Sequence, residues 1–199
     1  YNFVMHPRIE ISQFKNIIKN KTKLYENADI IVFATKWRTN TESQDGSNDL
    51  LVLDKTIQQI KEDNKKLIIF GPNPEFKYTL NKYRLTKIYL TNYKKKLIEE
   101  GTTNLSNTEL LSLEKVYYSQ YENNKDIIET NEKLKNISKK NNIKFVDLIS
   151  IVCDKDKKVC KFRSNKNKDE IFRDYGRFSL TGLSYFGNRF YNGKVLKFD

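Results

Sequence analysis

The chain has 199 residues, enough for one α/β domain with a buried core, and 38% of them are hydrophobic. Its formal net charge is +12, yet lysine is spread along the whole sequence, and no helix-turn-helix, zinc or RNA-binding signature accompanies it. We therefore do not expect a nucleic-acid partner. No apolar run reaches the roughly 20 residues that cross a bilayer, and no signal-peptide pattern is present.

Hydrophobic spacing predicts strands and helices that alternate along the chain. The continuous β-branched run over residues 28–35 is typical of a strand buried on both faces of a parallel sheet. The basic, Tyr-rich residues 77–100 predict one or two helices beside the sheet. In chain order the predicted elements are strand 3–5, helix 12–25, strand 28–35, helix 50–60, strand 66–70, helices 106–121 and 126–140, strand 143–149 and helix 179–191.

This alternation predicts an α/β fold with three αβα layers, in which a doubly wound, mostly parallel sheet carries helices on both faces. We expect one domain over residues 1–199. Parallel sheets of this kind bind ligands beyond the carboxyl ends of their strands. The candidate ligand-binding loops are therefore those that follow predicted strands: 36–47, 71–77 and 150–178.

The sequence contains two cysteines, Cys153 and Cys160, which enclose a six-residue hydrophilic loop. No histidine or second cysteine pair completes a metal site beside them, so no metal and no other cofactor is predicted. We favour a disulfide over two free thiols. A disulfide implies an oxidising compartment and would stiffen the loop.

Four features follow one another along the chain: Ala34-Thr-Lys-Trp37, Gly71-Pro-Asn-Pro-Glu75, the Cys153/Cys160 loop and Asp174-Tyr-Gly-Arg-Phe-Ser-Leu-Thr-Gly182. In their order and spacing they resemble the SGNH domain at the carboxyl end of many acyltransferase family 3 membrane proteins. The resemblance covers roughly residue 28 to the end. It implies an SGNH hydrolase-like, flavodoxin-like fold. It also implies a lineage of enzymes that move acyl groups, usually acetyl, onto bacterial surface glycans.

The chemistry of that family uses a serine in a Gly-Asp-Ser block, a histidine base and an aspartate that orients the base. No Gly-Asp-Ser occurs in this sequence, so the strand that carries the nucleophile either precedes Tyr1 or is absent. Asp174 matches the orienting aspartate, and Arg177 stands where the family has histidine. Arginine stays protonated and cannot accept the proton of a serine, but it can hold a carboxylate or another anion bidentately.

The resemblance also suggests residues around the substrate. Asn40 lies where an oxyanion donor is expected, and Trp37 is expected to form a wall of the acyl or sugar site. The alternative is that Trp37 caps the core and Asn40 forms a turn. We expect Ser179 to cap the last helix and Gly182 to let that helix approach the sheet. The single histidine, His6, is expected to be structural or exposed.

The sequence therefore predicts a domain related to the glycan O-acetyltransferases and esterases of the bacterial cell envelope. In an active relative, a serine would be acylated and the acyl group passed to a sugar hydroxyl or to water. With Arg177 in place of histidine, this chain is expected to be inactive as it stands. The alternative is a non-catalytic subunit that binds an envelope glycan or serves a larger assembly.

The expected location is periplasmic or extracellular, with a membrane tether in a missing amino-terminal part. The expected partners are an envelope glycan, an acyl donor, and a membrane domain or another protein.

Overall fold

The computed structural model describes residues 3–5, 16–18, 20, 22–34, 37, 49–76, 106–163, 171–172 and 178–192. The chain divides into two compact units. Tyr1–Pro72 and Lys125–Ile149 form the first unit, and Asn73–Asn124 and Ser150–Asp199 form the second. The single domain expected over residues 1–199 stays a prediction.

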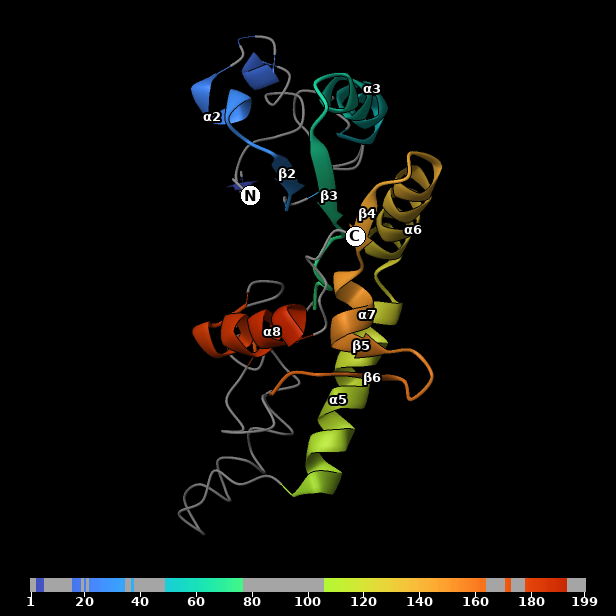
Figure 1. The fold of residues 1–199 in the computed structure, drawn as a ribbon. Helices are drawn as coiled ribbons and strands as arrows, with labels where there is room; N and C mark the ends of the chain where they lie inside the picture. Colours follow the sequence, from blue (N-terminus) through green and yellow to red (C-terminus); the bar gives the residue numbers. More distant parts are fainter. Residues whose placement is uncertain are drawn as a thin grey trace. The chain divides into compact units, whose positions relative to one another are not determined.

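A four-stranded parallel sheet organises the first unit (Figure 1). Adjacent strands keep a register in which Ile31 lies opposite Leu67 and Phe33 lies opposite Ile69. The parallel sheet and its helices confirm the predicted α/β class. The described strands lie in chain order: β1 (Phe3–Met5), β2 (Ile30–Phe33), β3 (Lys66–Phe70) and β4 (Lys144–Val146).

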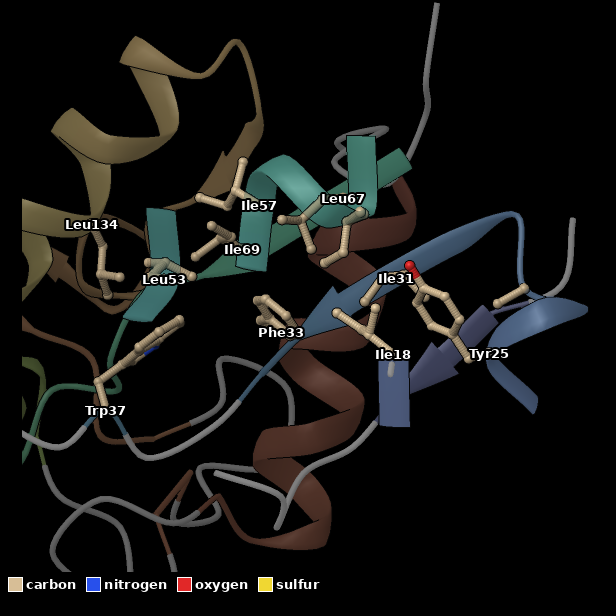
Figure 2. Close-up of a cluster of buried hydrophobic side chains, with 12 residues drawn as sticks. Ile18, Tyr25, Ile31, Phe33, Trp37, Leu53, Ile57, Leu67, Ile69 and Leu134 are labelled. Atoms are coloured by element: carbon tan, nitrogen blue, oxygen red, sulfur yellow. The ribbon is translucent and has the colours of Figure 1, made fainter. Parts of the chain in front are cut away.

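The core of the first unit lies where helix α3 (Asp49–Glu62) packs on this sheet (Figure 2). The α3 side chains Leu53, Ile57 and Ile60 are fully buried and recur at the spacing that places them on one helical face. Side chains on both faces of the central strands are buried, as expected for a sheet that is covered on both sides.

The helix predicted over residues 12–25 is interrupted among its described residues. Residues 16–18 are helical, and a separate short helix, α2 (Lys23–Glu26), begins after Thr22. Thr22 has an extended backbone (φ −57°, ψ 145°), and its side-chain oxygen accepts a hydrogen bond from the backbone N–H of Tyr25. The prediction of one continuous helix was wrong because Thr22 acts as an N-cap: its side chain accepts a hydrogen bond from a backbone N–H in the first turn of α2, where a new helix begins.

A polar cluster fixes the segments that lead into β2 and β3. The Tyr25 hydroxyl donates to Asp63 Oδ2 at 2.6 Å, and the Lys65 ammonium donates to the backbone oxygens of Glu26 and Ala28. Burial and the hydrogen bond to Asp63 raise the pKa of Tyr25 far above its ordinary value, so its hydroxyl remains a donor.

Strand β4 is shorter than the strand predicted over residues 143–149. It follows helix α6 (Lys125–Lys140) and ends at Val146, and helix α7 (Leu148–Val152) begins two residues later. Aspartate is a favoured residue immediately before a helix, and Asp147 occupies that position. The apolar residues after Asp147 were therefore assigned to the wrong kind of element.

The second unit contains helix α5 (Asn107–Glu122), the hairpin strands β5 (Cys153–Asp154) and β6 (Val159–Cys160), and helix α8 (Leu180–Asn192). Its core is aromatic: Phe76 packs edge-on against Tyr117, which in turn stacks on Phe162. Tyr117, Tyr118 and Tyr121 are all buried on α5. No helix among the described residues is long and apolar enough to cross a membrane.

Candidate functional site

Trp37 lies just beyond the carboxyl end of β2, where the sequence placed a wall of the substrate site. Its side chain is only 7% exposed and belongs to the hydrophobic core of the first unit (Figure 2). The indole Nε1–H donates to the backbone oxygen of Phe70, the last residue of β3, at 2.8 Å. Trp37 thus ties the chain after β2 to the end of β3. Its contact with an acyl group or sugar stays a prediction, and Asn40 lies outside the described residues.

Gly71, at the carboxyl end of β3, lies close to side chains of α6 and β4. The Gly71 N–H donates to the oxygen of Val146 at 2.9 Å, which continues the pairing with β4. A Cβ on Gly71 would collide with Asn131 Oδ1 and lie 2.9 Å from Phe145 Cζ. The Gly-Pro turn after β3 therefore also serves close packing against α6 and β4.

Sequence reasoning missed a polar pair at the carboxyl end of β4. Asn131, on α6, is 3% exposed, and its Nδ2 donates to Asp147 Oδ1 at 3.2 Å. Asn131 Oδ1 has no hydrogen-bond partner among the described residues and faces the backbone of Gly71. A sequence signal for this pair was the position of Asn131. It precedes Leu134 by three residues and so lies on the same, core-facing side of the amphipathic helix α6.

The predicted disulfide is present and joins Cys153 to Cys160 across the β5–β6 hairpin. The turn of this hairpin is held by Asp154, whose Oδ1 accepts from the backbone N–H groups of Asp156 and Lys157. The hydrogen bond from the Lys157 backbone is the main cause that lowers the pKa of the Asp154 carboxyl, and the Lys157 side chain adds to it. The turn is therefore well defined by hydrogen bonds.

Asp174 and Arg177, the predicted catalytic positions, lie outside the described residues, as does His6. Residues on either side are described: Phe172 and Phe178 form an antiparallel bridge, and their rings are 5.2 Å apart.

The start of α8 has the N-cap that the sequence predicted. The Ser179 Oγ accepts from the N–H of Gly182 at 3.0 Å. A Cβ on Gly182 would collide with the Ile171 carbonyl oxygen, so the absence of a side chain lets α8 approach the backbone of Ile171. The contact with Ile171 was not predicted, and the expected approach of Gly182 to the sheet stays a prediction.

In the second unit, Glu114 on α5 and Lys161 after β6 form a half-buried ion pair at 3.7 Å. Burial raises the pKa of Glu114, and the charge of Lys161 offsets only part of that rise. No cluster of three or more His, Cys, Asp or Glu side chains that could hold a metal ion occurs among the described residues.

The Glu114→Gln substitution is expected to raise the free energy of unfolding near pH 7. A carboxyl group whose pKa is raised by folding contributes full stability below its ordinary pKa and loses it as the pH rises through the folded pKa. The gain from Gln should therefore shrink near pH 4, below the ordinary glutamate pKa. Urea unfolding at both pH values measures it, and Glu132→Gln, at an exposed site, should change stability little at either. A gain that is larger near pH 4 would contradict the prediction.

Comparison with known proteins agrees with this fold. Neither the search of curated proteins nor the search of solved structures found a match. A family model described as "SGNH domain (fused to AT3 domains)" matches residues 7–192, nearly the whole chain. This match confirms the SGNH-like, acyltransferase-associated domain that the sequence motifs suggested, and the chain belongs to the family of SGNH domains that are fused to AT3 domains.

Proposed function

We propose that this chain serves a system that acylates envelope glycans outside the cytoplasm, and that it binds its ligand without turning it over. The family membership supports a domain related to esterases and acetyltransferases. The observation that carries the rest is Arg177 in Asp174-Tyr-Gly-Arg177, at the position that the resemblance assigns to the histidine of the family's Asp-x-x-His motif.

Arginine changes what this position can do. A histidine base must lose and regain a proton near neutral pH, and a guanidinium group with a pKa above 12 does not. The sequence also contains no Gly-Asp-Ser block to supply a nucleophile. A guanidinium group is instead suited to hold a carboxylate in a bidentate arrangement. The ligand class that this chemistry favours is an acidic glycan.

The disulfide supports the proposed location. Structural disulfides persist in oxidising compartments such as the periplasm or the cell exterior, and are rare in the cytosol. Fusion to AT3 domains within the family further supports a membrane acyltransferase as the partner of this domain. Envelope glycans lie in the same compartment that both features favour.

The catalytic part of the proposal is tested with a chromogenic acetyl ester and a serine-directed fluorophosphonate probe. An active SGNH esterase is the positive control. We expect hydrolysis no faster than in buffer and no labelling of the chain, both for the native sequence and for Arg177→His, because the sequence has no Gly-Asp-Ser block to label. Ester turnover at the rate of the control enzyme would contradict the proposal.

The binding part is tested by titration with an acidic and a neutral oligosaccharide of the same length. Arg177→Ala should weaken binding of the acidic sugar about 10- to 100-fold, as expected for loss of a charge-assisted pair. Lys155→Ala, at the exposed tip of the β5–β6 hairpin, is the matched charge control and should change affinity little. Equal losses in the two variants would indicate attraction by net charge rather than a site at Arg177.

A further inference from the structure

We infer that oxidation of Cys153 and Cys160 controls whether the segment that borders Asp174 and Arg177 is ordered. This closing segment is defined here as the described residues 171–172 and 178–182. The closing segment is not adjacent to the cysteines in the sequence, because it begins eleven residues after Cys160. The coupling rests on a series of backbone hydrogen bonds and ring contacts within the second unit.

The hairpin that carries the cysteines is too small to be stable by itself. Strands β5 and β6 have two residues each and form a two-stranded sheet of their own. Two-stranded hairpins are marginally stable in water, even when they are longer. The two residue pairs of the ladder are therefore not expected to keep the hairpin closed, and the disulfide supplies the covalent link that does.

The hairpin in turn positions the residues that follow it. Cys160 is completely buried, and the Lys161 N–H donates to the oxygen of Val152, the last residue of α7, at 2.9 Å. The next residue, Phe162, is 2% exposed and stacks on Tyr117 of α5 with an interplanar angle of 3°. The register of β6 thus decides where the Phe162 backbone lies.

The closing segment is attached to that backbone. The Ile171 N–H donates to the oxygen of Phe162 at 2.7 Å, and the Ser179 N–H donates to the oxygen of Ile171 at 2.8 Å. The start of α8 rests on the same Ile171 carbonyl group through Gly182. The closing segment is thus bonded to Phe162, whose backbone position depends on the hairpin. Loss of the hairpin register is therefore expected to release the closing segment.

The redox step is ordinary thiol–disulfide exchange. The two cysteine thiols lose two electrons and two protons as the S–S bond forms, and a disulfide oxidant such as oxidised glutathione is reduced to two thiols. Cys153 is 3% exposed and Cys160 is completely buried, so the formed bond reacts with a reductant only after local opening. The closing segment should therefore become ordered during oxidative folding and then stay ordered.

Hydrogen exchange of the full chain tests the inference, with the oxidised protein compared against Cys153→Ser/Cys160→Ser. Amide protection in peptides that contain Ile171 and residues 179–182 should fall roughly 50-fold or more, the change expected when closure of a loop this short is lost. Amides of β2 and β3, in the first unit, should keep their protection. A reductant should reproduce the loss in the native sequence and change nothing further in the variant.

A second readout comes from the chain's single tryptophan, which lies in the first unit. Trp37 fluorescence should give the same urea midpoint for the oxidised chain and the double serine variant. Loss of protection confined to residues 153–160 would overturn the inference, because the disulfide would then stabilise only its own hairpin. Loss of protection in β2 and β3 together with a lower Trp37 midpoint would also overturn it, because the disulfide would then be a general stabiliser.

Discussion

Gly182→Ala is expected to lower the free energy of unfolding by about 2–3 kcal/mol, the cost typical of an overpacked contact. A Cβ at this position would collide with the carbonyl oxygen of Ile171 and lie 2.9 Å from its carbonyl carbon. Both are backbone atoms, and the Ile171 oxygen also accepts a hydrogen bond from the N–H of Ser179. The Ile171 carbonyl group therefore cannot rotate away from the added Cβ. The helix α8 must move off Ile171 instead.

Gly187→Ala in the same helix is the matched control. Among the described residues, no atom beyond the adjacent residues and the nearby backbone of α8 lies within 4 Å of the Cβ that alanine would add there, and Gly187 is exposed. Because alanine is the better helix former, this variant should gain up to about 1 kcal/mol. Urea or thermal unfolding followed by circular dichroism measures both. Variants that shift stability in the same direction would contradict the close contact with Ile171.

Trp37→Phe is expected to cost about 2–3 kcal/mol of unfolding free energy. Phenylalanine removes the Nε1–H that bonds the Phe70 oxygen at 2.8 Å, and its smaller ring leaves a gap in the core of the first unit. Circular dichroism during urea unfolding is the measurement, since the variant has no tryptophan.

The comparison variant for Trp37 is Tyr25→Phe, which keeps the ring of another core residue and removes the hydroxyl group that donates to Asp63. Its cost should be about 1–2 kcal/mol, because no ring volume is lost. If Trp37→Phe left stability unchanged and weakened binding of an oligosaccharide, Trp37 would be a wall of the ligand site and not a tie between β2 and β3.

The central strands β2 and β3 were predictable because each contains a short run of apolar residues rich in isoleucine. The prediction failed where a side chain overrides the local pattern. Thr22 starts a new helix inside a stretch with continuous helical spacing, and Asp147 precedes a helix inside an apolar run. In both places a short polar side chain stands at the start of a helix.

The sequence by itself determined the α/β class, the alternation of elements, the pairing of Cys153 with Cys160 and the cap at Ser179. These features depend on residue type and on spacings of a few residues, which local physics constrains strongly.

Only the tertiary structure decided that Trp37 bonds Phe70, that Asn131 bonds Asp147 and that Gly182 lies on Ile171. The Trp37 contact spans 33 residues and the Asn131 contact 16. No local pattern encodes these partners, because each is chosen by how the strands and helices pack. The role of the cysteine pair is the clearest example. Its spacing predicted a disulfide, but the hydrogen bonds from Lys161 to Val152, from Ile171 to Phe162 and from Ser179 to Ile171 connect that disulfide to the segment beside Arg177.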